Sequence, residues 1–318
     1  MHDAIIDVGG IKVGHSTDFN ALKGCTIVLC EDGCMGGVDV RGGAPGTREV
    51  ALLGPLATMG EVNGIMLAGG SAFGLEAACG AMDYLEERGI GYDVRVTKVP
   101  IIPSAVLFDL AVGDCKIRPD KRMGYEACEN AKSDELERGS VGAGTGATVG
   151  KIFGYENCMK SGIGSASIRV GDLVVGAIFA VNAFGDVYDA ETNKIIAGAL
   201  NPERNGFADT LNLFKGEASG SPISQNTTIG VVATNAKLTK PEINKVAQMA
   251  HDGCARAIRP VHTMYDGDAI FGLSTCEVKA DATSVGILGA EVTARAIVDG
   301  IKTAKSLGGL PSMSDLEF

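Results

Sequence analysis

The sequence predicts a layered α+β protein in which helices and strands are mixed and one sheet is covered on both faces. Segments of helical and of strand character follow one another along the whole chain. Residues 173–181 are apolar on both faces of a predicted strand, and such a strand needs cover on each side. The chain has 318 residues, 45% of them hydrophobic, which is enough material for a large core.

The first predicted elements are a helix after residue 70 and a later β-hairpin. Ser71 stands where a helix cap would, and Gly89 follows the charged residues that end the helix. The residues around Ser71 resemble a nucleophile elbow, but Phe73 occupies the position of its last glycine. Residues 165–170 and 173–181 predict the two strands of the hairpin, with a turn between them.

The C-terminal part of the chain begins with a change of pattern. Residues 201–225 are polar and rich in turn-forming residues, so we expect a long exposed loop. A buried strand over residues 227–234 follows, and Thr239 with Glu242 forms a capping box at the start of a helix that ends before Pro260. A strand over residues 270–278 and a helix over residues 284–305 are the last predicted elements.

Composition argues against several classes of function. The net charge is −11 and there is no block of Lys and Arg, so nucleic acid is not an expected partner. The apolar runs are too short to span a membrane, and the acidic N-terminus does not resemble a signal peptide. Nine scattered Cys indicate reduced thiols, and together these features predict a cytoplasmic protein.

Metal and nucleotide sites are not expected either. Cys30 and Cys34 lack a second pair or a nearby His, and the four His lack the spacing of a metallohydrolase. We therefore expect structural or surface roles for His251 and His262. Residues 146–151 fall one residue short of a phosphate-binding loop. The sequence predicts neither a cofactor nor a metal.

The junction of Asn226 and Thr227 joins the polar loop directly to the buried strand. A cut at this peptide bond would make Thr227 a new N-terminus that carries both a hydroxyl nucleophile and an α-amine. With an ordinary pKa of about 7.7 to 8.0, that amine is a base suited to neutral pH. The same order of a polar loop followed by a buried strand is also explained by an ordinary loop that leads into a β-branched strand residue.

Eight segments, in order along the chain, match one known family: GHS at 14–16, DVRGGAPGTR at 39–48, AGGSAFGL at 68–75, FDL at 108–110, GAGTG at 142–146, AVNAFG at 180–185, NTTIGVVAT at 226–234 and DGDAIF at 266–271. The chain thus resembles the DmpA family of L-aminopeptidase/D-esterases, β-peptidyl aminopeptidases and nylon-oligomer hydrolases. The resemblance implies a single domain, residues 1–318, with the four-layer αββα sandwich of N-terminal-nucleophile type. It also implies self-cleavage into an α subunit (1–226) and a β subunit (227–318), assembled as a homo-oligomer of αβ heterodimers.

The resemblance also implies roles for individual residues. Thr227 matches the nucleophile, which would attack the Asn226 carbonyl during maturation and a substrate amide afterwards. Asn182 matches the residue whose side-chain N–H stabilises the oxyanion, although alone it is also typical of a turn at a strand end. Asp266 and Asp268 match an acidic pair that would bond the hydroxyl and amine of Thr227. Alone, two acids around one glycine also suit a turn or a calcium site, but the next three residues supply no side-chain oxygen.

Lys151 matches a lysine of the nylon-oligomer hydrolases, where its charge would lower the pKa of the α-amine and stabilise the oxyanion. The alternative is an exposed lysine at the start of a strand. The aminopeptidase members carry Tyr in place of Gly150, and Ser and Glu in place of the two acids. The catalytic arrangement of this chain therefore favours the branch that contains the nylon-oligomer hydrolases.

Taken together, the sequence predicts an autoprocessed threonine hydrolase that cleaves amides through an acyl-enzyme. The expected substrates are small peptides, β-peptides or ω-amino acid oligomers. Two alternatives stay open. One is an acyltransferase on the same fold, as in the ornithine acetyltransferases, and the other is a non-catalytic binding protein whose chain is never cut.

Overall fold

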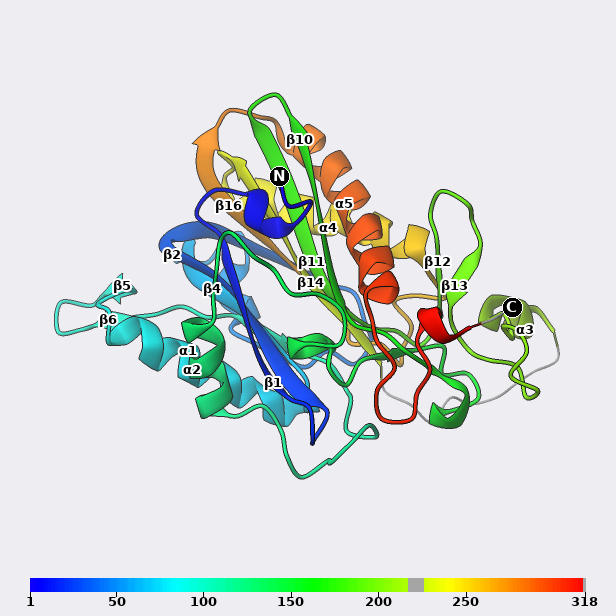
Figure 1. Ribbon diagram of the computed structural model, residues 1–318. Coiled ribbons are helices and arrows are strands. Elements are labelled where there is room, and N and C mark those ends of the chain that lie inside the picture. The colour runs from blue at the N-terminus through cyan, green and yellow to red at the C-terminus, as the bar shows by residue number, and fades with distance from the viewer. Residues whose placement is uncertain (217–225, 317–318) are drawn as a thin grey trace.

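The strands form two β layers, and one long strand, β2 (Lys23–Val40), belongs to both of them (Figure 1). The computed structural model describes residues 1–216 and 226–316. Strands β1 (Lys12–Asp18) and β4 (Glu61–Ala68) pair with the first part of β2, whereas β16 (Ala269–Val278) pairs with residues 35–40 of its last part. The register between β2 and β4 shifts between these two stretches, as at a β-bulge, which bends a strand.

The remaining strands extend the same sheet on both sides of β2. Two of the neighbouring pairs are parallel, β14 with β16 and β4 with β7, and the others are antiparallel. The sheet has the order β10 (Ile163–Val170), β11 (Leu173–Asn182), β14 (Thr227–Ala236), β16, β2, β4, β7 (Ser104–Val106), β3 (Thr47–Arg48), with β1 beside β2. Short pairings join β5 (Tyr92–Asp93) to β6 (Lys98–Val99), β8 (Thr148–Val149) to β9 (Met159–Lys160), and β12 (Asp186–Tyr188) to β13 (Ile195–Ala197) and β15 (Ile258–Arg259).

Helices cover the outer face of each β layer (Figure 1). On one side α4 (Lys240–Ala257) packs with α5 (Ala282–Lys302), and on the other α1 (Ala77–Glu86) packs with α2 (Lys121–Glu129). The short helix α3 (Thr210–Lys215) has six residues. Single 3-10 turns are η1 (Ile5–Asp7), η2 (Val50–Leu53), η3 (Ser71–Glu76), η4 (Gly142–Gly144), η5 (Tyr155–Asn157) and η6 (Met313–Asp315).

Three clusters of buried side chains hold these layers together. The inner cluster joins the two β layers, the second joins α4 and α5 to the sheet, and the third joins α1 and α2 to it. Representative members are Val28, Ile178 and Phe271 of the inner cluster, Val246 and Ile297 of the second, and Ile27, Met66 and Leu85 of the third. The four-layer αββα sandwich that the sequence predicts is therefore confirmed, since burial on both faces of the sheet requires this cover.

Most predicted elements are present within a few residues of their expected bounds. The hairpin is β10 and β11, with Gly171 at a φ of 59° in its turn. The capping box also forms, because Thr239 N–H donates to Glu242 Oε2 at 2.7 Å. Among the described helices, none combines the length and the apolar character that crossing a membrane would need.

Two expectations need correction. Ser71 does not cap a helix: it is the first residue of η3, has a φ of 55°, and Gly70 holds the cap position. The reason is a long-range contact, since Gly70 N–H donates to the buried Asp109 Oδ1 at 2.7 Å and thereby fixes this turn. The predicted loop over residues 201–225 contains the helix α3, and its residues 217–225 lie outside the described part of the chain.

Candidate active site

The antiparallel register of β11 and β14 places Asn182 opposite Thr227. Asn182 is the last residue of β11 and Thr227 the first of β14, so both side chains lie at the same edge of the sheet. Their exposed fractions are 0% and 4%. Asn182 is thus a buried residue at the end of a strand, as both the oxyanion role and the alternative of a turn at a strand end allow.

The segment Asp266–Asp268 runs beside the junction of Asn226 and Thr227. Asn226 forms a parallel bridge with Asp266, and Gly267 N–H donates to the carbonyl oxygen of Asn226 at 2.8 Å. Thr228 N–H donates to Asp268 Oδ1 at 2.6 Å. The two segments lie side by side because β14 and β16 are parallel neighbours that begin at the same edge.

Two donors converge on the Asn226 carbonyl in the uncut chain. The Thr227 hydroxyl donates to this oxygen, as does Gly267 N–H. A Cβ at residue 267 would stand 2.8 Å from Thr227 Oγ1 and 2.6 Å from Ala44 O, so glycine allows the close approach. Sequence reasoning did not single out Gly267, although a glycine between two matched acids was a usable signal.

Lys151 is buried against Asn182, which excludes the alternative of an exposed lysine. Its exposed fraction is 1%, and its Nζ donates to Asn182 Oδ1 at 3.0 Å and to the carbonyl oxygen of Thr148 at 2.8 Å. Thr148 N–H also donates to Asn182 Oδ1, at 3.1 Å. Because both partners of Oδ1 are donors, the amide nitrogen of Asn182 points the other way, where it donates to Phe108 O at 2.9 Å.

Burial shifts the protonation of two groups at this edge. It lowers the pKa of Lys151 to about 7, against the opposing effect of Cys158, Asp266 and Asp268. It also raises the pKa of Asp266, and the neighbouring Asp268 raises it further. Perturbed groups of this kind are concentrated at functional sites.

The acidic pair makes contacts other than those expected. Asp266 Oδ2 accepts bonds from the N–H and the hydroxyl of Thr263, at 2.9 and 2.6 Å. Asp268 accepts from Thr228 N–H and has its other oxygen against the ring of His262, 2.7 Å from Nδ1. The structure therefore brings both acids beside Thr227 but bonds them, in the uncut chain, to its neighbours.

Two histidines that sequence reasoning treated as structural or exposed adjoin this acidic pair. His262 contacts Asp268, and its Nε2 lies 3.1 Å from Nδ1 of His251 on α4. His251 is buried, and the ring of His262 is largely buried. Spacing alone did not reveal the link, because it depends on how the end of α4 packs beside the loop before β16.

Aromatic side chains surround the same edge. The ring of Phe184 lies 6.0 Å from that of Phe214 on α3 and 6.1 Å from that of Tyr265. Phe184 is two residues from Asn182, and the carbonyl of Tyr265 accepts the N–H of Asn226 at 2.8 Å. Phe214 and Tyr265 are exposed, so this group offers an apolar surface next to the junction.

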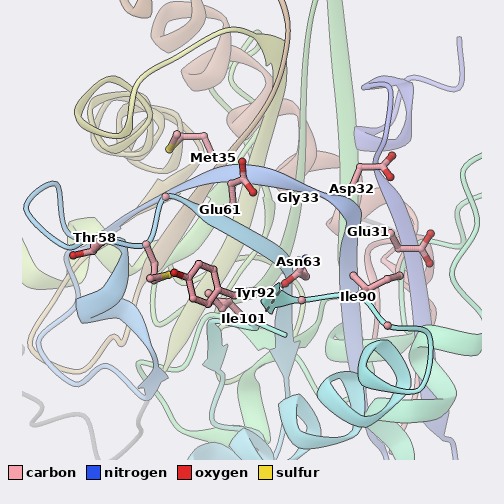
Figure 2. A pocket seen from close by; sticks show the side chains of 14 residues that line it. Glu31, Asp32, Gly33, Met35, Thr58, Glu61, Asn63, Ile90, Tyr92 and Ile101 are labelled. Atoms are coloured by element: carbon pink, nitrogen blue, oxygen red, sulfur yellow. Dashed lines mark hydrogen bonds between the residues drawn. The ribbon is translucent and has the colours of Figure 1, made fainter. Parts of the chain in front are cut away.

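A separate pocket lies where β2 and β4 change register (Figure 2). Three carboxylates, those of Glu31, Asp32 and Glu61, belong to its lining together with Asn63 and Tyr92. None of the residues predicted for catalysis lines it.

Comparison with known proteins identifies relatives over nearly the whole chain. The model of "Peptidase family S58" matches residues 3–313. An uncharacterised aminopeptidase of Mycobacterium leprae is 40% identical, with 98% of this chain and 93% of that protein covered. A 6-aminohexanoate-oligomer endohydrolase of Kocuria sp. is 29% identical, with 93% of this chain and 85% of that protein covered.

Solved structures show the same fold at low sequence identity. The L-aminopeptidase D-Ala-esterase/amidase of Ochrobactrum anthropi, described as a variant of the Ntn hydrolase fold, superposes with a TM-score of 0.73 at 19% identity. The alignment covers 98% of this chain and 88% of that one. A β-aminopeptidase of Burkholderia sp. superposes with a TM-score of 0.71, also at 19% identity, over 98% of this chain and 90% of that one.

Burial of Lys151 has a measurable consequence for stability. Because its pKa falls from 10.5 to about 7 on folding, the unfolded chain binds more protons between these values, and stability rises with pH there. Replacing Lys151 by Met should flatten this rise by a few kcal/mol, on the order expected for a shift of this size. Urea unfolding between pH 7 and 10 measures it. The control is Lys12→Met, which removes a partly exposed lysine paired with Glu31. Equal slopes of stability against pH for the wild type and Lys151→Met would contradict the lowered pKa of Lys151.

Proposed function

The chain belongs to peptidase family S58, and from this membership and the site geometry we propose that it is an autoprocessed amide hydrolase with Thr227 as its nucleophile. The observation that carries the proposal is the convergence of the Thr227 hydroxyl and Gly267 N–H on the Asn226 carbonyl. A hydroxyl held against the preceding carbonyl, beside a backbone donor, is the arrangement that acyl transfer between the two residues requires.

Maturation follows from this contact. Thr227 Oγ1 adds to the carbonyl carbon of Asn226 as its proton passes, directly or through water, to the Thr227 nitrogen that will leave, while Gly267 N–H stabilises the negative charge on the oxygen. The C–N bond then breaks, and an ester joins the two pieces. Water hydrolyses the ester to leave a carboxylate at Asn226 and a free amine at Thr227. The products are residues 1–226 and 227–318.

The same residues support turnover in the mature protein. The α-amine of Thr227 takes the proton of its own hydroxyl, directly or through water, as the oxygen attacks a substrate amide. Asn182 is the proposed oxyanion donor, through the Nδ2 hydrogen that does not go to Phe108 O, because Lys151 and Thr148 fix the orientation of its amide. Leaving-amine release and water attack on the acyl-enzyme complete the cycle.

The charged groups set the state of the amine. Lys151 is cationic below its pKa of about 7, and in that form it would lower the pKa of the Thr227 amine and so favour the free base. Asp268 bonds Thr228 N–H, one residue along, and is placed to bond the amine once the chain is cut. We assign Asp266 the same holding role from the opposite side of Gly267, with its carboxylate oriented by Thr263.

The proposed substrates are short amides with an apolar acyl part. The relative from Kocuria sp. is named for 6-aminohexanoate oligomers, and the apolar surface of Phe184, Phe214 and Tyr265 adjoins the nucleophile here. Small peptides, β-peptides and ω-amino acid oligomers all fit such a surface. Assembly of the two-piece protein into a homo-oligomer is part of the proposal.

The nucleophile is tested by replacing Thr227. We expect Thr227→Ala to abolish both self-cleavage and amide hydrolysis, because no hydroxyl is left, and Thr227→Ser to keep both at a reduced rate. Intact mass under denaturing conditions distinguishes one 318-residue chain from the two pieces. A wild-type chain that stays whole on long incubation, or an active Thr227→Ala variant, would show that the assignment is wrong. Faster release of acyl groups to added amines than to water would favour the acyltransferase.

Gly267 is tested by adding one methyl group. Its Cβ would stand 2.8 Å from Thr227 Oγ1, so we expect Gly267→Ala to slow self-cleavage by about 100-fold, the usual effect of losing one oxyanion donor. The time course of cleavage in freshly refolded protein measures this. Gly206→Ala is the matched control, since its Cβ would meet Asn201 Nδ2 at 3.6 Å. Equal rates for the two variants would count against the donor role of Gly267.

The aromatic surface is tested by truncating Phe214. We expect Phe214→Ala to raise KM for ω-amino acid oligomers by about tenfold and to leave self-cleavage unchanged, because it removes binding area and no reacting group. Phe19→Ala, which truncates another exposed ring, serves as the control. A panel of p-nitroanilides, β-peptides and ω-amino acid oligomers measures both variants. An unaltered KM across this panel would place substrate binding elsewhere.

A further inference from the structure

A continuous line of hydrogen bonds leads from α4 to the acidic pair. His251 Nε2 lies 3.1 Å from the carbonyl oxygen of Asp39, and His251 Nδ1 lies 3.1 Å from His262 Nε2. His262 Nδ1 lies 2.7 Å from Asp268 Oδ2, and Asp268 Oδ1 accepts Thr228 N–H at 2.6 Å. The line ends one residue from Thr227.

The partners at the two ends determine where the protons are. A backbone carbonyl can only accept, so His251 Nε2 carries a hydrogen. Burial lowers the pKa of His251, which keeps the ring neutral and leaves Nδ1 as an acceptor. His262 Nε2 must then donate to it. One proton is therefore shared between His262 Nδ1 and Asp268 Oδ2, whichever of the two atoms holds it.

We propose that His262, supported by His251, is a positioning residue that keeps a shared proton on Asp268 and thereby holds the charge next to the Thr227 amine at zero. This inference rests on the proposed role of Thr227. His262 also fixes the carboxylate geometrically, because its backbone N–H donates to the same Oδ2 at 3.2 Å. The ring and the backbone N–H of His262, whose φ is 56°, thus contact the same oxygen.

The surrounding charges make this shared proton important. Besides Asp268, the groups that act on the line are Asp39 near the end of β2, Arg41 just after that strand, Cys254 from α4, and Asp266 with Lys151 at the sheet edge. Without the proton, Asp268 would add a full negative charge beside Asp266 and close to the new amine. An anion there stabilises the ammonium form, which cannot act as a base.

A bound metal is the competing explanation for the same side chains. Ligand atoms of His251, Cys254 and His262 lie within 4.8 Å of one another. However, burial raises the pKa of the Cys254 thiol well above its ordinary value, and the two ring nitrogens already satisfy each other. With a shared proton, every ring nitrogen of the two histidines has a hydrogen-bond partner, whereas a structural metal would need a fourth ligand as well. The metal content of the purified protein is therefore measured as part of the test.

Kinetics test the role in the mature protein. Gln at 262 can still donate to Asp268 but cannot supply the shared proton, so we expect the acidic limb of the kcat/KM profile of His262→Gln to move up by about one pH unit. At pH values well below this limb, activity should fall about tenfold with it. The acidic limb of His251→Gln, which keeps an acceptor for His262, should stay closer to that of the wild type than the limb of His251→Leu does. His15→Gln, which changes another largely buried imidazole that bonds Thr26, should leave the profile unchanged.

A spectroscopic measurement separates this inference from the proposed function. We expect a strongly downfield proton signal in the NMR spectrum of the wild type, present in His15→Gln and lost in His262→Gln and in Asp268→Asn. The signal does not depend on cleavage, so it can be read from Thr227→Ala as well. Its absence from well-folded Thr227→Ala, an unshifted acidic limb in His262→Gln, or a stoichiometric metal that Cys254→Ser removes would each overturn the inference.

Discussion

Parallel pairing of β14 with β16 is the constraint on which the site depends. Parallel neighbours begin at the same edge of a sheet and need a long crossover, which here contains α4. The residues just before each strand are therefore held side by side, and these are Asn226 before β14 and Asp266 to Asp268 before β16. The antiparallel register of β11 then adds Asn182 from the other side. A one-residue slip in either register would turn the Thr227 side chain to the opposite face.

Burying charged groups at this edge costs folding free energy, and the contacts show how the cost is limited. Lys151 Nζ has four oxygen partners, from Thr148, Asn182 and Ala183, which solvate its cationic form below the pKa of about 7 that burial imposes. Asp266 relies on Thr263 in the same way. Buried ionisable groups usually destabilise a fold relative to apolar residues of similar size. Their concentration beside one peptide bond is understandable if the proposed chemistry depends on them.

The sequence predicted the layers and most elements because hydrophobic periodicity and caps are local signals. The hairpin around Gly171 and the helix that starts after Thr239 are examples. Ser71 was misassigned because a long-range bond, from Gly70 N–H to Asp109, sets the local backbone. Resemblance identified Thr227, Asn182, Lys151 and the acidic pair, and their roles stay predictions. Gly267 and the two histidines were missed, since a backbone N–H has no signature in the sequence and His251 meets His262 only through packing.

Cleavage would change the partners at this edge without moving the strands. In the uncut chain the N–H of Gly267 is occupied by the Asn226 carbonyl, and Asp268 is occupied by Thr228 N–H and His262. If the Asn226 carboxylate moves away once the peptide bond is cut, Gly267 N–H would meet a substrate carbonyl in the same place. The donor that polarises the scissile bond would then polarise each later substrate, because β14 and β16 hold it at a fixed position relative to the Thr227 hydroxyl. Maturation and turnover would thus use one preorganised geometry, in which only the acyl group differs.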